Sequence, residues 1–406
     1  MQKGPGVATF CILHFAFQMD LRLLTIIILV VAAALRSEIF FYLLYVLVGV
    51  QLVAWLWVRT ATRSLRWSRS LPAASFPGEP VEVTLTVRNQ GLMPIPWLAL
   101  HESIPASLRT PSSVRHVIAL GPREERRLAY TLLGQRRGLY RLGPLSLRTG
   151  DVLGLFERPL SGDTGDSLVI YPHVLPLPEL GLPAALPFGA RPALGSLFTD
   201  PARPIGVRPY ASGDGVRQID WKSSARTNAL QVRSHEPAIA RDTTIALAFS
   251  LAEYPGRYTY DALERAIVAA ASIAADLVRR GQPVGLCTSG HDPIANAPAA
   301  PIASAAGRAH LIEILRLLGR LEARPEGALA PVLERVTAGL GWGSTLVVIA
   351  CGGGQQLVER LLPLRRRGLH VALVLVEGSA DDLALARRHQ LAAYLVSRAG
   401  APELTR

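Results

Sequence analysis

The sequence predicts a multi-domain membrane protein with an N-terminal transmembrane helical hairpin, an immunoglobulin-like β-sandwich and a C-terminal doubly wound α/β domain. Three observations predict this combination. Hydrophobic residues make up 50% of the 406 residues and the mean hydropathy is +0.27, so part of the chain is expected to lie in lipid. The middle of the chain alternates apolar and polar residues, as half-buried strands do. The last part alternates short apolar strands with amphipathic helices, as parallel sheets do.

Two apolar segments near the N-terminus predict an anchor in the lipid bilayer. Residues 39–58 are interrupted only by Gln51 and measure about 30 Å as a helix, the thickness of one hydrocarbon core. Residues 21–35 are fewer and would cross by tilting or by thinning the bilayer. Residues 21–58 therefore predict two transmembrane helices. Aromatic residues that mark the two membrane interfaces are Phe40, Phe41, Tyr42, Tyr45, Trp55 and Trp57.

Residues 1–20 precede this hairpin as an apolar leader, and Met19 is an alternative translation start to Met1. A signal peptide is the competing interpretation of residues 21–35. No small-residue cleavage site precedes the next apolar run, so we favour a transmembrane helix.

The charges that flank the hairpin predict its orientation. The hairpin tip carries only Arg36 and Glu38, whereas four arginines follow the second helix, at Arg59, Arg63, Arg66 and Arg69. By the positive-inside rule, both ends of a multi-pass hairpin then face the cytoplasm, and the soluble domains are cytoplasmic.

Residues 59–172 predict the β-sandwich. In its clearest strand, apolar residues alternate with polar ones at Val81, Val83, Leu85 and Val87. Further short strands, separated by Gly and Pro turns, are predicted at 97–101, 117–120, 127–133 and 145–148. Residues 173–207 then predict a linker without regular structure, because its prolines interrupt ladders and helices. These prolines include Pro176, Pro178, Pro183, Pro187, Pro192, Pro201 and Pro204.

Residues 242–406 predict the α/β domain. Strands are expected at 243–251, 284–288, 344–350, 370–376 and 393–396, and helices at 260–280, 308–322, 331–340, 355–367 and 380–390. The first helix has capping-box spacing at Asp261 and Glu264, and Gly281 is its expected C-cap. Strands that alternate with helices in this way are typical of a doubly wound sheet.

The net charge of +12 comes almost wholly from arginine, because lysine occurs only at Lys3 and Lys222. An arginine surplus is compatible with nucleic-acid or anionic-lipid partners. No Lys/Arg run resembles a nucleic-acid-binding arm, so we expect no nucleic-acid partner. Cys11, Cys287 and Cys351 lie in apolar settings, which indicates reduced thiols and not a disulfide framework or metal site.

One charged motif, RPYASGDGVRQIDWKSSARTNALQVRSHE, occupies positions 208 to 236 within a segment at residues 208–241. Its candidate site residues are Arg208, Tyr210, Gly213, Asp214, Arg217, Asp220, Trp221, Lys222, Arg226, Arg233 and Glu236. Opposite charges this close form either a structural ionic cluster between two domains or a partner- or anion-binding site. The balance of acids and bases favours the structural cluster. A further alternative is a metal-dependent hydrolase, for which Asp214, Asp220 and Lys222 would be the catalytic residues.

The motif resembles domain-of-unknown-function family 58 of bacteria and archaea, whose hallmark is R-x-Y-x-x-G-D-x-x-R-x-I-D-W-K-x-S-A-R followed by V-R-x-x-E. A second stretch, RGLYRLGPLSLRTGDVLGLF at 137–156, resembles the upstream signature of that family. The resemblance implies a bacterial inner-membrane protein with a von Willebrand factor type A-like domain. It also implies a partner, a MoxR-type AAA+ ATPase.

Von Willebrand type A domains commonly bind a divalent cation through Asp-x-Ser-x-Ser after the first strand and an Asp after a later strand, since Mg²⁺ prefers oxygen ligands. In this sequence the first site has Ala248, Ser250 and Ala252, and the later one has Cys351 followed by Gly352. Both carboxylates are missing. We therefore expect a vestigial site with no metal, and no cofactor.

These observations favour a membrane-anchored scaffold or protein-interaction protein without catalytic residues, which works with the ATPase in protein assembly or maturation. The alternatives are a membrane-associated hydrolase that uses the charged motif, and a nucleic-acid binder.

Overall fold

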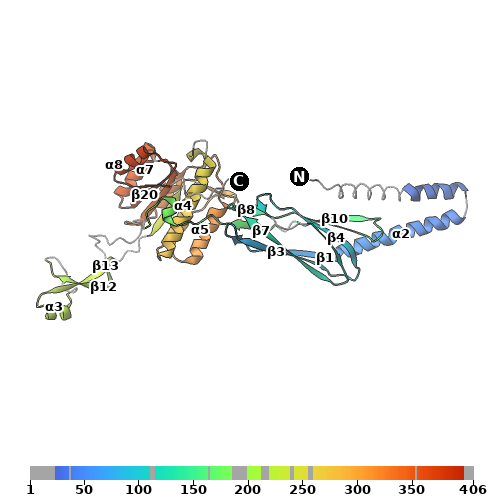
Figure 1. The fold of residues 1–406 in the computed structure, drawn as a ribbon, viewed down its shortest axis with the longest axis horizontal. Helices are drawn as coiled ribbons and strands as arrows, with labels where there is room; N and C mark the ends of the chain where they lie inside the picture. The colour runs from blue at the N-terminus through green and yellow to red at the C-terminus, as the bar shows by residue number, and fades with distance from the viewer. Residues whose placement is uncertain are drawn as a thin grey trace. The chain divides into compact units, whose positions relative to one another are not determined.

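The computed structural model divides the chain into two compact units, Met1–Tyr171 and Pro172–Arg406, which are described separately (Figure 1). The structure describes residues 23–35, 38–109, 115–162, 165–184, 199–211, 219–237, 242–254, 259–352 and 354–396. The predicted leader at residues 1–20 lies outside these ranges and stays a prediction.

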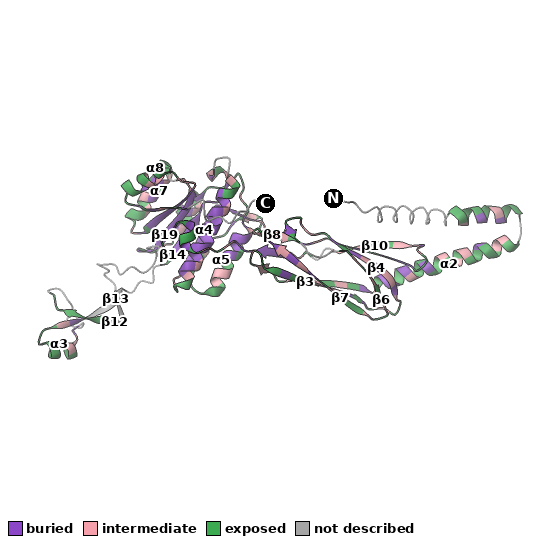
Figure 2. Ribbon diagram, viewed as in Figure 1, coloured by how far each residue is buried: buried purple, intermediate pink, exposed green. Residues whose placement is uncertain are grey.

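The first unit begins with two apolar helices. Helix α2 (Glu38–Arg63) has a mean hydropathy of 2.2 over its apolar window and is long enough to cross a membrane. The helix Leu23–Leu35 spans only about 20 Å at 1.5 Å per residue, less than a hydrocarbon core. The Gln51 side-chain amide donates a hydrogen bond to the Thr25 hydroxyl, N to O 2.7 Å, which joins the two helices. Most side chains of α2 are exposed, as Figure 2 shows, and a helix that faces lipid has this distribution.

Helix α2 continues five residues beyond the predicted end and is packed into the β-sheet domain that follows. Trp57 packs against the hydrophobic core of that domain, and its indole N–H donates to the carbonyl of Pro94 at 3.1 Å. Arg158 donates to the Thr62 hydroxyl at 3.0 Å. Trp57, predicted as a membrane-interface residue, therefore belongs to the contact between helix and sheet. The guanidinium of Arg59 lies 4.9 Å from the ring centroid of Trp55, a cation–π contact.

The β-sheet domain consists of short strands in three sheets. Its strands are β1 (Leu65–Ser70), β2 (Ala74–Ser75), β3 (Pro80–Asn89), β4 (Ile95–Glu102), β5 (Leu108–Arg109), β6 (Arg115–Leu120), β7 (Glu125–Gly134), β8 (Gly138–Arg141), β9 (Leu145–Gly150), β10 (Glu157–Gly162) and β11 (Ser167–Ile170). Their orders are β1-β3-β7-β5, β10-β9-β4-β6 and β2-β11-β8. All pairs in the two four-stranded sheets are antiparallel.

The hydrophobic core lies where side chains of the two four-stranded sheets meet. Strand β3 alternates buried and less buried residues, which confirms the predicted period of two. Its Leu85 and Val87 pack in one cluster with Leu98 of β4 and Leu147 of β9. Gly and Pro residues lie in several turns between these strands, as the sequence predicts.

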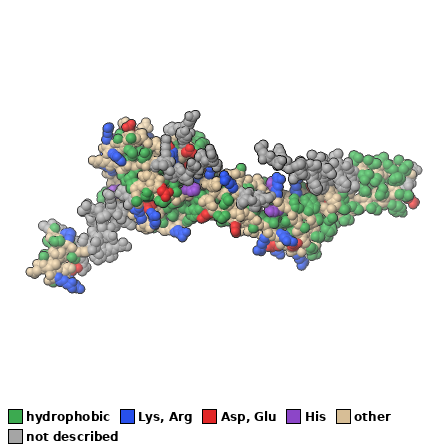
Figure 3. Space-filling model, viewed as in Figure 1, with side chains coloured by type: hydrophobic (Ala, Val, Ile, Leu, Met, Phe, Trp, Pro, Cys, Tyr) green, Lys and Arg blue, Asp and Glu red, His purple; other side chains and the backbone are tan. Residues whose placement is uncertain are grey.

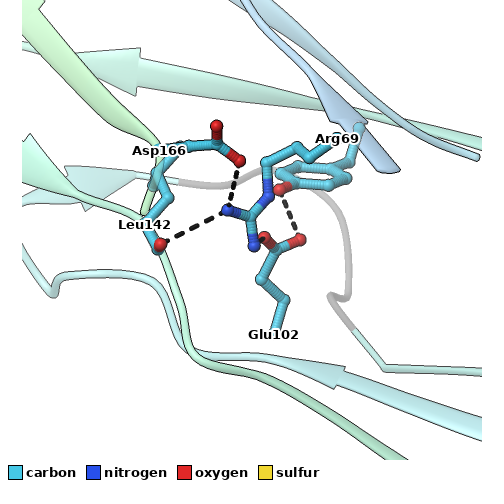
Figure 4. Close-up of polar contacts among 5 residues, drawn as sticks. Arg69, Glu102, Leu142 and Asp166 are labelled. Carbon is cyan, nitrogen blue, oxygen red and sulfur yellow. Dashed lines mark hydrogen bonds and ion pairs between the residues drawn. The ribbon is translucent and has the colours of Figure 1, made fainter. Parts of the chain in front are cut away.

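A buried ionic cluster connects β1, β4 and the chain before β11 (Figure 4). The Arg69 guanidinium pairs with Glu102 and donates to Asp166 at 3.0 Å and to the carbonyl of Leu142 at 3.3 Å. The hydroxyl of Tyr130 donates a hydrogen bond to the carboxylate of Glu102. Burial, and next the neighbouring Glu102 carboxylate, raise the pKa of Tyr130. The side chain of Arg69 is 0% exposed, so its predicted role as a membrane-flanking charge is wrong.

The second unit begins in the predicted linker, and the structure differs from that prediction. The 3₁₀ turn η1 (Leu177–Leu180) buries Leu177 and Leu180, and strand β12 (Thr199–Pro209) pairs with β13 (Gln231–Pro237). The register shifts on both sides of Pro204. Prolines are compatible with strands at such irregularities, because no regular ladder hydrogen bond is required there.

The remainder of the second unit is a six-stranded sheet with helices between its strands. Its elements are β14 (Thr243–Leu247), η3 (Leu251–Glu253), α4 (Thr259–Arg279), β15 (Val284–Thr288), β16 (His291–Asp292), β17 (Ala297–Pro298), β18 (Ile302–Ala305), α5 (Arg308–Arg320), α6 (Leu329–Thr337), β19 (Thr345–Cys351), α7 (Gln355–Arg366), β20 (His370–Val376), α8 (Ala380–Arg388) and β21 (Ala392–Leu395). The strand order is β18-β15-β14-β19-β20-β21, parallel except for β18. This is the strand order of a doubly wound sheet. The direction in which successive strands are added across the sheet reverses between the neighbouring strands β14 and β19.

Helix α4 packs against the sheet and is buried along most of its length (Figure 2). Its predicted C-cap is confirmed: Gly281 adopts φ +72°, and its N–H donates to the carbonyl of Val278 at 2.9 Å. The helix starts at Thr259, so Asp261 lies in its first turn and is not the N-cap.

Candidate functional site

The charged motif folds as a helix between two paired strands. Helix α3 (Trp221–Thr227) follows Asp220, whose carboxylate accepts a hydrogen bond from the backbone N–H of Ser223 at 2.9 Å. Asp220 is therefore the N-cap of α3. Asn228 ends the helix in the left-handed conformation, at φ 51°. The motif residue Asp220 thus acts on the local backbone.

Ser224 connects α3 to strand β13. Its hydroxyl donates to the carbonyl of Asp220 at 2.8 Å and accepts from the N–H of Gln231 at 2.8 Å. The N–H of Asp220 donates to the carbonyl of Gln231, also at 2.8 Å. Ile219 pairs with Val232, and both are buried. These contacts fix the orientation of α3 on the two strands.

The side chains that α3 directs outward are aromatic and cationic. Trp221 is 65% exposed, and Lys222 and Arg226 are exposed one helical turn apart. Among the described residues, neither Lys222 nor Arg226 has a hydrogen bond or ion pair. The space-filling view shows hydrophobic and cationic side chains together on this part of the chain (Figure 3).

Three more exposed apolar residues come from the segments beside α3: Val207, Tyr210 and Leu230. Together with Trp221, Lys222 and Arg226 they are named the motif surface. Val207 and Tyr210 lie at the end of β12 and just after it, and Leu230 directly precedes β13. Isolated exposed apolar residues are ordinary, whereas several in one short stretch of chain make a candidate interaction surface.

The other predicted motif residues are not part of the motif surface. Arg208 is exposed and donates to the carbonyl of Pro209 at 3.3 Å. Arg233 and Glu236 lie in β13, where the structure describes only their backbone. Three predicted residues lie outside the described ranges: Gly213, Asp214 and Arg217.

The predicted vestigial cation site lies at the carboxyl end of β14. Ala248 and Ser250 are buried and Ala252 is exposed. The Ser250 hydroxyl donates to the carboxylate of Glu253 at 2.9 Å, and the Ser289 hydroxyl donates to the same oxygen at 2.7 Å. Hydroxyls that could contribute to a cation site are thus engaged by an internal carboxylate.

Glu253, which is not among the residues predicted from the sequence, also reaches helix α6. The backbone N–H of Leu329, the first residue of α6, donates to the other carboxylate oxygen of Glu253 at 2.5 Å. Helix α6 has no capping side chain of its own at Ala328. A carboxylate at a helix N-terminus also interacts favourably with the helix dipole. The Ser-x-x-Glu spacing of Ser250 and Glu253 is the signal that could have identified this pair.

A second, largely buried ion pair lies at the carboxyl end of β20. Arg265 of α4 pairs with Glu377, which follows β20 and adopts φ 60°. Burial raises the pKa of the Cys351 thiol at the end of β19. Within the described parts of the chain, no cluster of three or more His, Cys, Asp or Glu side chains is arranged to hold a metal ion.

Comparison with known proteins finds a family match that includes the charged motif. Residues 206–350 match the family described as "Protein of unknown function DUF58". The "Uncharacterized protein YeaD" of Bacillus subtilis (strain 168) is 24% identical over 285 residues, which cover 67% of this chain and 68% of that protein.

Likenesses to solved structures are weak. A native alpha-2-macroglobulin structure from Escherichia coli is 13% identical with a TM-score of 0.24, and the match covers 27% of this chain and 17% of that chain. The CARDB domain of a Pyrococcus furiosus protein is 16% identical with a TM-score of 0.19, over 26% of this chain and 91% of that one. Scores this low support no conclusion about fold or function. The family resemblance predicted from the motif is nevertheless confirmed by the match at residues 206–350.

Proposed function

We propose that this chain is a membrane-anchored protein-interaction protein whose motif surface binds a protein partner without catalysis. The observation that carries the proposal is the exposure of Trp221, 65%, beside Lys222 and Arg226, which have no described polar partner. Trp, Tyr and Arg dominate the energetics of protein interfaces, because they bury large apolar areas and retain a polar group.

The chemistry of the motif surface indicates the partner that fits it. The apolar residues require a hydrophobic pocket, and the two cations require carboxylates at the rim of that pocket. The partner is therefore expected to offer an apolar cleft beside an acidic edge. Based on the family resemblance, we propose a MoxR-type AAA+ ATPase.

Two arrangements support a role without catalysis. Asp220, one of the two carboxylates that the hydrolase alternative would use, accepts a hydrogen bond from the first turn of α3. At the carboxyl edge of β14, the hydroxyls of Ser250 and Ser289 both donate to Glu253. Polar groups in these roles stabilise the fold locally.

We also propose a fold type for each of the two units. We infer that the first unit is immunoglobulin-like, which its two packed antiparallel sheets support. We infer that the second unit is von Willebrand factor type A-like. The strand order β18-β15-β14-β19-β20-β21, with only the edge strand β18 antiparallel, supports this inference.

A binding measurement between the full chain and the proposed ATPase tests this function directly. The full chain, reconstituted in nanodiscs, is titrated with a purified MoxR-type AAA+ ATPase. We expect Trp221→Ala to weaken binding by on the order of 30-fold, the effect of one interface hot spot. Charge reversal by Lys222→Glu and Arg226→Glu is expected to weaken it further.

The matched control is Trp342→Ala, because Trp342 is 67% exposed and lies outside the motif surface. Equal losses at Trp221 and Trp342 would point to nonspecific adhesion. Wild-type protein that never binds the ATPase would exclude this partner, and unchanged binding by all motif variants would exclude the surface.

We further propose a multi-pass hairpin in the inner membrane with cytoplasmic soluble units. The hydrogen bond between Gln51 and Thr25 and the exposed Arg59 and Arg63 at one end of α2 support this topology. In intact cells, Glu38→Cys should react with a membrane-impermeant maleimide, whereas Arg63→Cys should react only after lysis. The reverse labelling pattern would contradict the proposed orientation.

A further inference from the structure

An apolar groove of about 520 Å³ lies between helix α2 and the loop that joins β9 to β10. The helix contributes Val46, Gly49, Val50, Val53, Ala54 and Trp57, and the loop contributes Asp151, Val152 and Leu153. Val152 is 73% exposed and Leu153 is 62% exposed. Two consecutive apolar residues thus extend from a turn of the sandwich beside a helix that is long and apolar enough to cross a membrane.

The groove lies along the apolar run of α2. Arg59 is the first charged residue at this end of the apolar run. Val46 precedes Arg59 by 13 residues, so the groove reaches roughly 20 Å along the helix from that charge at 1.5 Å per residue. If the apolar run of α2 lies in hydrocarbon, the loop beside it lies in the same layer.

The backbone of the loop is built for such an environment. The Asp151 carboxylate accepts hydrogen bonds from the N–H groups of Leu153 at 3.0 Å and Phe156 at 2.6 Å. The carbonyl of Asp151 accepts from the N–H of Gly154 at 3.3 Å. Asp151 itself is only 4% exposed. In lipid an unpaired backbone N–H group is costly, because no water is present to accept its hydrogen bond, and this turn pairs three such groups internally.

We propose that the loop Val152–Leu153 inserts into the bilayer beside α2 and that lipid acyl chains fill the groove. The sandwich would then contact the membrane at two points, the helix and this loop. The proposal concerns the first unit only and does not depend on what the motif surface binds.

Nitroxide labelling of the full chain in phosphatidylethanolamine and phosphatidylglycerol vesicles tests the insertion. Val152→Cys and Leu153→Cys are each labelled in a chain that carries Cys11→Ser and Cys351→Ser. Cys287 is retained because it is 1% exposed, and the parent chain without a new cysteine measures any labelling there. The matched control is Val117→Cys, because Val117 of β6 is also 73% exposed and lies on the same sandwich.

Collision of the label with oxygen, which concentrates in lipid, is compared with collision with a water-soluble nickel chelate. We expect labels at 152 and 153 to lose collisions with the chelate and gain collisions with oxygen, and the label at 117 to show the opposite. Chelate access equal to that at 117 would place the loop in water and overturn the proposal. Protection of the label from both oxygen and the chelate would also overturn the proposal, because protein and not lipid would then cover the groove.

Discussion

The carboxylate of Glu253 accepts a hydrogen bond from the hydroxyl of Ser250, O to O 2.9 Å, at the carboxyl end of β14. Ser250 is 0% exposed, and the same carboxylate also accepts from Ser289 and from the first N–H of α6. One acidic side chain thus organises three segments that are distant in sequence.

Removal of this carboxylate is expected to destabilise the second unit. Glu253→Ala leaves three donors without their acceptor, at a cost of about 1–3 kcal/mol. This loss lowers the melting temperature of a unit of this size by about 2–10 °C. Calorimetry of the full chain in detergent measures the shift, with the exposed helix residue Glu334→Ala as the control. Equal melting of the two variants would show that the hydrogen bonds at Glu253 contribute no net stability.

The buried ion pair of Arg69 and Glu102 gives a second prediction. Arg69→Leu leaves the buried carboxylate of Glu102 and the partly exposed carboxylate of Asp166 without their cation. We expect a loss of about 3–5 kcal/mol in the free energy of unfolding. The control is Arg66→Leu, because Arg66 lies on the same strand with its side chain exposed. Denaturant unfolding of the full chain compares the two variants, and similar midpoints would contradict the assigned role.

The buried thiol of Cys287 predicts a pH dependence. Burial raises its pKa from 9.0 to about 12. The folded chain therefore retains the proton more tightly than the unfolded chain, so the stabilisation is complete below pH 9 and is lost as the pH rises to 12. Within that interval Cys287→Ala should lose stability less steeply than the wild type, by up to about 1.4 kcal/mol for each pH unit. Unfolding measured at a series of pH values tests this, and the two curves should run parallel below pH 9.

The capping role of Asp220 distinguishes a structural motif from a catalytic one. Asp220→Ala removes the acceptor for the Ser223 N–H and is expected to cost α3 about 1 kcal/mol. Asp220→Asn keeps a capping oxygen and should preserve the helix. Hydrogen exchange of the α3 amides in the full chain measures both variants. A chain in which Asp220→Asn retains normal exchange but loses a hydrolytic activity would favour the enzyme alternative.

Much of the second unit could be predicted from its sequence, because the signals are local. The apolar runs of β15 and β20 were predicted with the bounds that the structure shows, and Gly281 correctly predicts the end of α4. The edge strand β18 was missed, because Ile-Ala-Ser-Ala is short and only weakly apolar. Its presence depends on pairing with β15, a contact that no local pattern contains.

The roles of charged residues were harder to predict. In the sequence, Arg69 resembles a membrane-flanking charge because it follows the apolar helix together with three other arginines. In the structure, strand β1 directs its side chain into the interior of the β-sheet domain. Glu253 acts on Leu329, 76 residues later, so its main contact is set by the tertiary fold. The motif residue Asp220 carries a local N-cap signal, an Asp immediately before a helix, and this signal was available in the sequence.

Only Ser64 separates the end of α2 from the start of β1, and the contacts of Trp57 and Thr62 fasten the helix to the sheets. Such a junction has no hinge. In the proposed membrane topology, a tilt of α2 that matches a thinner or thicker bilayer would rotate the β-sheet domain through the same angle. Lipid composition would thereby set the direction in which the attached sheets stand above the membrane plane.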